Sequence, residues 1–196
     1  MDYNLAKDYL TNLQLDECEN FFKQNNCFLE IGYCELLRGK INEAKRTFNI
    51  VRNGDFRASW AYLFIQFMQN RIQVMPTYLQ IRNFLEIDTG FLIKAQMYEH
   101  LENVINAADL FFEVNPESYK FISRVLLNYD FDEAAEIYLE RGSSRCFNDP
   151  ELHFLYGNYY LKNNQIKSAK HEFETCLDVL DGYYPATMML ENLNNY

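Results

Sequence analysis

The sequence predicts an all-α fold, a right-handed α-solenoid of antiparallel helix pairs with about six irregular repeats and a C-terminal capping helix. Three observations predict it. The 196 residues include only four prolines and seven glycines, a scarcity that favours long helices over turn-rich β folds. A spaced pattern of small and aromatic residues recurs along the chain. Prolines and glycines also fall where that pattern places the starts and ends of helices.

The recurring pattern is a small residue, then Ala twelve positions later, then an aromatic residue four beyond. Its two best copies are Gly32, Ala44 and Phe48, and Gly157, Ala169 and Phe173. In two antiparallel helices, small residues let the backbones approach closely and the aromatic ring fills the remaining wedge. Looser copies are Ala6, Cys18 and Phe22; Ala95, Ala107 and Phe111; and Ile122, Ala134 and Tyr138. Tight turns are expected at 38–40, 128–130 and 163–165.

Helices are expected in pairs along the whole chain. The first helices of the pairs are expected near 2–12, 27–38, 56–70, 90–101, 116–127 and 150–162. Their partners are expected near 15–25, 41–53, 76–86, 103–113, 131–141 and 166–180, with a last helix near 184–194. Proline suits a first helical turn, as at Pro76, Pro116, Pro150 and Pro185, and glycine suits a helix end, as at Gly54, Gly90, Gly142 and Gly182. This divides one domain, 1–196, into repeats near 1–25, 26–54, 55–87, 88–114, 115–148 and 149–183 and a cap at 184–196.

These motifs resemble the tetratricopeptide-repeat (TPR) family of helical-repeat proteins. Phe28, Ile31 and Gly32, and likewise Tyr156, Gly157 and Tyr160, carry its first-helix signature, and the Ala and Phe pairs carry its second. The resemblance implies a concave groove lined by the first helices, at positions that flank the small residue. The positions carried over are Leu29, Tyr33, Leu36 and Leu37; Leu92, Gln96, Glu99 and His100; Tyr119, Ser123, Leu126 and Leu127; and Phe154, Asn158, Leu161 and Lys162.

The resemblance implies a non-enzymatic adaptor or scaffold that binds a peptide or protein segment in this groove. The alternative is a dedicated chaperone or a peptide-sensing regulator of a bacterial secretion or signalling system. The chain's own helices, or a second copy in a homodimer, could also fill the groove. One TPR subclass clamps the C-terminal carboxylate of heat-shock chaperones with Lys and Asn. Asn158 and Lys162 stand at two clamp positions, but Tyr119 and Ser123 replace the other two.

The net charge of −10 is concentrated in the second half of the chain. Residues 1–100 carry 12 acids and 11 bases, whereas residues 101–196 carry 16 acids and 7 bases. Nucleic acid and anionic lipid bind mainly through Lys and Arg, so neither is an expected partner. The acidic half is interpreted as a solvated surface, with a surface for a basic partner as the alternative.

The sequence offers no motif for catalysis or for a cofactor. His100, His153 and His171 have no metal-ligand spacing, and no phosphate loop or nucleophile elbow occurs. Asp132, Glu136 and Glu140 are interpreted as a solvated stripe on one helix. An enzyme, a cofactor and a metal are therefore not expected, although a site hidden between repeats stays open. The aromatic residues of the predicted helix 56–70, namely Trp60, Tyr62, Phe64 and Phe67, are expected in the core, with exposure as a docking patch the alternative.

The cysteines and the N-terminus favour a reducing, aqueous compartment. The five cysteines form no CxxC pair, so we expect reduced, mostly buried thiols: Cys18, Cys27, Cys34, Cys146 and Cys176. The N-terminus lacks a basic region followed by an apolar run, and no apolar stretch approaches membrane-spanning length. The expected location is the cytoplasm, without membrane insertion.

Overall fold

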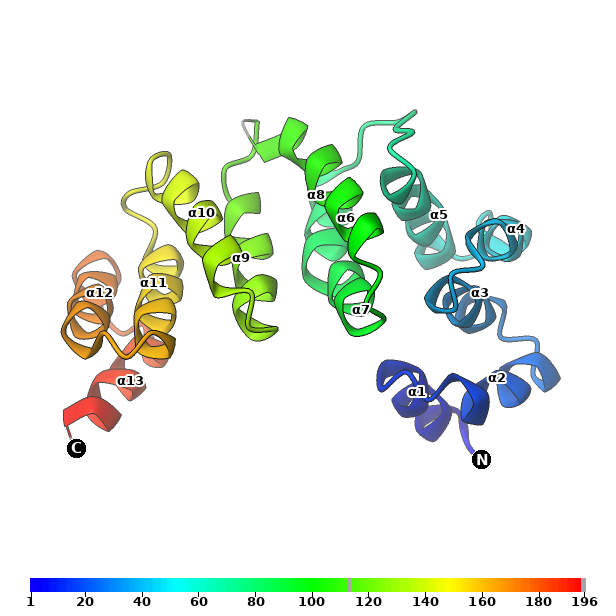
Figure 1. Cartoon of the computed structure of the whole chain (residues 1–196), viewed down its shortest axis with the longest axis horizontal. Helices are drawn as coiled ribbons and strands as arrows, with labels where there is room; N and C mark the ends of the chain where they lie inside the picture. Colours follow the sequence, from blue (N-terminus) through cyan, green and yellow to red (C-terminus); the bar gives the residue numbers. More distant parts are fainter. Residues whose placement is uncertain (113, 195–196) are drawn as a thin grey trace. The chain divides into compact units, whose positions relative to one another are not determined.

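The computed structural model describes residues 1–112 and 114–194, and its regular elements are all helical (Figure 1). The described residues contain no strand, which confirms the all-α prediction. The chain divides into two compact units, Met1–Leu110 and Phe111–Tyr196. We describe each unit by itself.

The first unit runs from α1 through most of α8. Its elements are α1 (Tyr3–Thr11), α2 (Leu15–Gln24), α3 (Phe28–Leu37), α4 (Ile41–Val51), α5 (Phe56–Met68), α6 (Tyr78–Asn83), the π-helical segment η1 (Phe84–Asp88), α7 (Thr89–Lys94) and α8 (Tyr98–Phe112). The second unit holds the end of α8 and α9 (Ser118–Asn128), α10 (Asp132–Ser143), α11 (Pro150–Lys162), α12 (Ile166–Val179) and α13 (Tyr184–Asn194).

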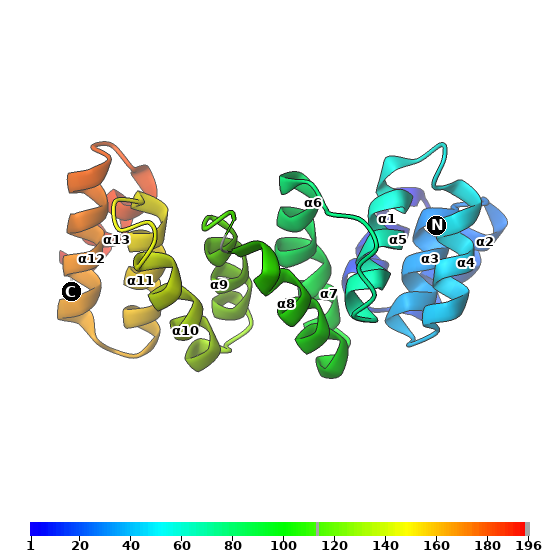
Figure 2. The ribbon, with the colours of Figure 1, turned by 90° about the horizontal axis from the view of Figure 1, so that it is seen from above.

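The recurring small residue is explained by an aromatic ring that lies directly over it. A Cβ atom added to Gly32 would lie 2.4 Å from Cε1 of Phe48, and one added to Gly157 would lie 2.3 Å from Cε1 of Phe173. Both rings are fully buried, as are the intervening alanines Ala44 and Ala169. Pairs α3–α4 and α11–α12 therefore pack side by side with their backbones close together (Figure 2). The first-repeat set of Ala6, Cys18 and Phe22 is also fully buried.

The same tight turn joins the helices of the pairs α3–α4, α9–α10 and α11–α12. One residue adopts a left-handed conformation, with φ of 75° at Gly39, 63° at Asp130 and 58° at Asn164. The next backbone N–H donates to the carbonyl five residues earlier, at 2.9 Å from Lys40 to Glu35 and 2.8 Å from Gln165 to Tyr160. This Schellman geometry caps the carbonyls at the first helix's end and reverses the chain direction. The bond recurs from Gln14 to Tyr9, Cys27 to Phe22, Arg71 to Gln66, Met97 to Leu92 and Phe131 to Leu126.

The prediction of a first helix at 90–101 is wrong. Helical structure continues from Tyr78 through η1 to Lys94, and the chain turns at Ala95–Met97 with Gln96 at φ 57°. Gly90 does not end a helix, because it is buried inside α7. The boundary expected near residue 87 therefore falls within this helical run. Ala95 lies in the turn, so it does not pair with Ala107 and Phe111, although those two residues are buried on α8.

The fifth repeat was predicted with a register error of one residue. Ala135 and Leu139 of α10 are fully buried, whereas Ala134 and Tyr138 are only partly buried. The turn lies at 129–131 instead of 128–130. Counting back twelve residues from Ala135 gives Ser123, which is small and fully buried. Ser123, and not Ile122, is thus the small residue of this pair.

Candidate functional site

The first unit contains a pocket of about 470 Å³ with aromatic walls. We call it the aromatic pocket. Helices α1, α3 and α5 and the α6–α7 run all contribute to it, through Lys7, Leu10, Thr11, Leu29, Glu30, Tyr33, Phe56, Arg57, Trp60, Asn83, Ile87 and Phe91. Apolar walls with a few polar groups are typical of ligand-binding pockets, and the volume lies within their usual range.

Segments far apart in the sequence meet at the aromatic pocket. Phe91 and Ala95 pack against the apolar cluster formed by α1, α2 and α3. The ring centroids of Tyr33 and Phe91 are 6.0 Å apart. The Lys94 ammonium donates a hydrogen bond of 3.0 Å to the carbonyl of Thr11, at the end of α1. The end of α7 thus returns to α1, and the two helices line the same pocket.

A buried carboxyl lies behind two pocket-lining residues. Asp88, which is 1% exposed, accepts a hydrogen bond of 3.1 Å from the Tyr33 hydroxyl and one of 2.7 Å from the Asn83 amide. Burial raises the pKa of Asp88 to about 7, although both hydrogen bonds favour the charged form. Burial also raises the pKa of Tyr33, and the Asp88 carboxylate adds to the effect. Asp88 ends the π-helical segment, and π-helical turns occur frequently at functional sites.

A second buried carboxylate lies in the pocket wall. Glu30 is 6% exposed and accepts a hydrogen bond of 2.5 Å from the Tyr3 hydroxyl. Burial and this hydrogen bond raise the pKa of Tyr3 to about 12. The neighbouring Arg57 guanidinium is bound at two points by Asp55, with Nε to Oδ1 at 3.1 Å and Nη2 to Oδ2 at 2.7 Å. Glu30 therefore has a phenol partner, whereas Arg57 has a carboxylate partner.

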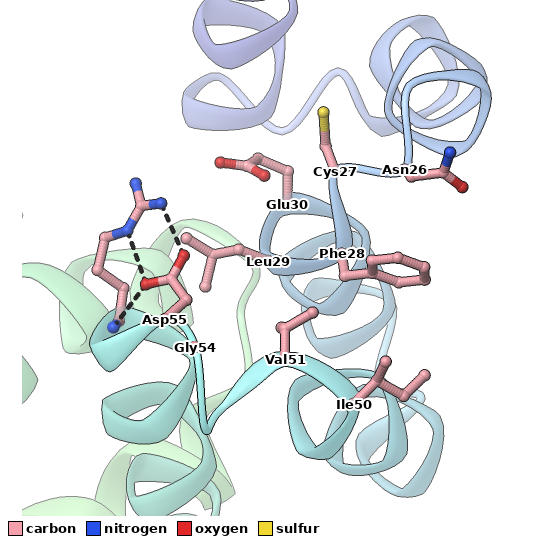
Figure 3. A pocket seen from close by; sticks show the side chains of 10 residues that line it. Asn26, Cys27, Phe28, Leu29, Glu30, Ile50, Val51, Gly54 and Asp55 are labelled. Carbon is pink, nitrogen blue, oxygen red and sulfur yellow. Dashed lines mark hydrogen bonds and ion pairs between the residues drawn. The ribbon is translucent and has the colours of Figure 1, made fainter.

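Leu29, Glu30 and Arg57 also line an adjoining pocket of about 500 Å³ (Figure 3). This pocket lies between the start of α3 and the α4–α5 connection. In Figure 3, Glu30 and Cys27 extend from the start of α3 toward one side, and Ile50 and Val51 border the opposite side. The Glu30 carboxylate thus lies at the margin shared by two pockets.

The second unit contains a pocket of about 580 Å³ between α9, α11 and α13. We call it the α9–α11 pocket. Its cations are already neutralised. The Lys162 ammonium lies 2.6 Å from Asp130 and 3.2 Å from Asp132 and also donates to the Leu127 carbonyl, while Arg124 is paired with Glu151. A C-terminal carboxylate would have to displace these acids to reach Lys162. This arrangement opposes the chaperone-type clamp.

The residues carried over from the TPR family fall into three groups. Leu29 and Tyr33 line the aromatic pocket, and Leu127, Phe154, Asn158, Leu161 and Lys162 line the α9–α11 pocket. Leu36, Leu37, Leu92, Tyr119, Ser123 and Leu126 are buried by packing, so their side chains do not line an open surface. Gln96 lies in a turn, and Glu99 and His100 lie in the first turn of α8 instead of in a first helix. Gln96, Glu99 and His100 were predicted wrongly because the first helix was placed at 90–101. Ser123 was predicted wrongly because of the one-residue register error in the fifth repeat.

The predictions for the aromatic residues of α5 and for the carboxylate stripe of α10 hold only in part. Phe64 and Phe67 are fully buried, as expected, but half-buried Trp60 lines the aromatic pocket. Tyr62 faces Arg52, whose guanidinium carbon lies 4.6 Å from the ring centroid. The α10 stripe is not simply solvated, because Asp132 pairs with Lys162 and Glu136 accepts a hydrogen bond from Tyr159.

Glu30, Phe56 and Asn83 were not predicted as site residues, and Trp60 was expected in the core, with exposure in a docking patch as the alternative. The sequence of α5 has apolar residues on nearly every face, so no periodicity separates its pocket side from its core side. Asn83 lies on a segment that was expected to be the second helix of its pair. Glu30 is an acidic residue among the apolar residues of α3. This was the only feature of the sequence that could have identified it as a site residue.

Several chemical features are absent from residues 1–112 and 114–194. No three His, Cys, Asp or Glu side chains gather to hold a metal ion there. All five cysteines are free, and none of the helices in these residues has the length and apolarity to cross a bilayer. No protein-family model matches the chain, and no curated protein shows significant similarity to it.

Proposed function

We propose that the chain is a non-enzymatic, TPR-like helical-repeat adaptor that binds a peptide or protein segment. The supporting observation is the spacing of its capping turns. The left-handed residues Gln96, Asp130 and Asn164 follow one another at intervals of 34 residues, which is the TPR period. Nearer the N-terminus the spacing is shorter, because Leu13 and Gly39, the turn residues of the pairs α1–α2 and α3–α4, are only 26 residues apart. Asn70 likewise lies 26 residues before Gln96. The array is therefore regular in its second half and compressed at its start.

The pockets support binding of a chain segment rather than of a phosphate or a free carboxylate. The α9–α11 pocket presents the half-exposed residues Phe154, Asn158 and Leu161, and its cations are paired with acids. In the aromatic pocket, Phe56 is 65% exposed beside half-buried Trp60. Exposed apolar side chains around a concavity, with amides nearby, suit the side chains and backbone of a bound segment.

Selection from a phage-displayed peptide library against the purified protein tests this function. Peptides enriched on the wild type should bind at least tenfold more weakly to Trp60→Ala or to Phe154→Ala with Asn158→Ala. The matched control is Ile166→Ala, because Ile166 is 44% exposed on α12 and lines neither pocket. Charged substitutions at Leu36 or Leu126 are unsuitable, since burying an unpaired charge would unfold the protein.

Circular dichroism of each variant should show that its helix content is unchanged. Two results would contradict the proposed function: no enrichment of any peptide, or enriched peptides that bind the pocket variants and the wild type equally well.

A further inference from the structure

We propose that the aromatic pocket binds a basic side chain, arginine or lysine, of the segment that the protein recognises, with Glu30 as its counter-ion. This inference rests on the proposed function. It adds a specific chemical preference, which the overall fold does not require.

Glu30 is a buried carboxylate that forms no direct ion pair, although its charge adds to the Asp55 hydrogen bond in raising the pKa of Arg57, which lines the same pocket. It is 6% exposed, and its Oε1 atom is held by the Tyr3 hydroxyl. None of the Lys or Arg side chains in the described part of the chain forms an ion pair with it. A buried carboxylate is costly unless it is paired and fully hydrogen-bonded. A guanidinium or ammonium that enters the pocket would supply the missing partner.

Two cationic side chains, Lys7 and Arg57, line the same pocket. Arg57 is engaged by Asp55 through two bonds, and its charge is thereby compensated locally. Lys7 lies against Tyr3, with its ammonium 5.8 Å from the ring centroid. Lys7 therefore opposes an incoming cation. Its removal should strengthen binding, so it provides an internal control on the sign of the interaction.

The pocket walls suit a cation as well as an apolar stem. Phe56 and Trp60 pack edge to face with their ring centroids 5.4 Å apart, and Phe56 is 65% exposed. Aromatic faces attract guanidinium and ammonium groups, and such rings also cover the methylene stems of Arg and Lys. Asp88 places a second carboxyl behind Tyr33.

The single tryptophan of the chain makes the test direct. Because Trp60 lines the pocket and no other Trp is present, its fluorescence reports occupancy of this site. The probes are ten-residue peptides with a central Leu-X-Leu in a Gly-Ser background, where X is arginine, citrulline or glutamate. The arginine peptide should change the Trp60 emission in a saturable way and bind at least tenfold more tightly than the isosteric citrulline peptide. Glutamate should bind most weakly.

Variants assign the preference to Glu30. Glu30→Gln, which can still accept the Tyr3 hydrogen bond, should bind the arginine and citrulline peptides equally, and Lys7→Gln should bind the arginine peptide more tightly than the wild type. Ile166→Ala, at a position that is exposed on α12 and lines neither pocket, should leave the emission titration unchanged. The comparison of arginine with citrulline on the wild type needs no variant, so a misfolded Glu30→Gln would not block the test.

Four outcomes would overturn the inference. The first two, on the wild type, are equal affinity for the arginine and citrulline peptides, and tighter binding of the glutamate peptide than of the arginine peptide. The third is a Glu30→Gln variant that still prefers arginine over citrulline. The fourth is a stable dimer in light scattering whose Trp60 emission does not respond to peptide. If library peptides depend on the pocket residues but carry no basic side chain, the proposed function stands and only this inference fails.

Discussion

At the residue scale, the two buried glycines carry the strongest packing constraint. Gly32→Ala and Gly157→Ala would each place a methyl group within 2.4 Å of a ring carbon that is fully buried. Overpacking of this kind costs about 1–3 kcal/mol. We expect each variant to lower the free energy of unfolding by that amount in urea titrations followed by circular dichroism.

Gly54→Ala is the matched control for these two variants. Its added Cβ atom would have only the Val51 carbonyl oxygen within 4 Å, at 3.8 Å. Its unfolding free energy should therefore stay within about 0.5 kcal/mol of the wild type. A Gly32→Ala protein as stable as Gly54→Ala would show that Phe48 moves aside without cost, and the packing explanation of the repeat would be lost.

Asp88 predicts a pH dependence of stability at the residue scale. Its folded pKa of about 7 lies above the unfolded value near 3.8, so the folded state favours the protonated form. The stabilising contribution is fully present below about pH 3.8 and is lost as the pH rises toward 7. The wild type should therefore lose stability relative to Asp88→Asn over this window, by a few kcal/mol at about 1.4 kcal/mol per pKa unit. Paired urea titrations at pH 4.5, 6 and 8 measure the difference, and a constant difference would contradict the prediction.

At the element scale, the capping turns offer a stabilising substitution. Gln96 is exposed and adopts φ 57°, a conformation that costs an ordinary residue about 1–2 kcal/mol. Gln96→Gly removes this cost, although it increases the entropy of the unfolded chain. We expect a net gain of about 0.5–1 kcal/mol in thermal and urea unfolding.

Glu102→Gly gives the opposite expectation and serves as the comparison for Gln96→Gly. Glu102 is exposed in the interior of α8, where glycine should cost about 1 kcal/mol. If both substitutions destabilise the protein equally, the left-handed turn at Gln96 is not the conformation that the protein adopts.

The elements that the sequence predicts well are those with a local signal. Gly39 and Asn164 suit left-handed turns, and the helices on either side begin and end within two residues of their expected positions. The α6–α7 run failed because Gly90 resembles a helix end when it is considered alone. Gly90 lies inside α7, where Thr89, Gly90 and Leu92 are all buried, and no local pattern in the sequence records that burial. The π-helical segment likewise has no signature in the sequence.

At the scale of the whole molecule, the aromatic pocket could not have been predicted. It forms because α7 returns to α1, through contacts such as Lys94 with Thr11 that join residues 83 positions apart. The family pattern places a groove at fixed positions of each repeat, and two of four such positions on α3, Leu29 and Tyr33, do line this pocket. Glu30, Trp60 and Asn83 line this pocket because of how α3, α5 and α6 lie around it, and no motif marks them.

The division into two units leads to a prediction for cysteine reactivity in the native protein. Cys27 and Cys146 are partly buried, one in each unit, whereas Cys18, Cys34 and Cys176 are fully buried. Burial raises the pKa of all five thiols, to about 11 at Cys176, and full burial also shields Cys18, Cys34 and Cys176 from a reagent in solution. Titration with a thiol reagent at pH 8.5 should modify only Cys27 and Cys146 before unfolding.

The three buried thiols then report how the two units unfold. Cys18 and Cys34 belong to the cluster of α1–α3, with their sulfur atoms 4.0 Å apart, and Cys176 belongs to a separate cluster of α11–α13. Each cluster is held by packing among its own helices, and different parts of a protein can open with different free energies, so the two clusters need not open together. Pulsed labelling across a urea gradient, read by peptide mass spectrometry, should give Cys18 and Cys34 one shared midpoint and Cys176 a different one. A single urea midpoint for all three cysteines would contradict this prediction. It would mean that the helices between the two clusters couple them into one cooperative unfolding unit.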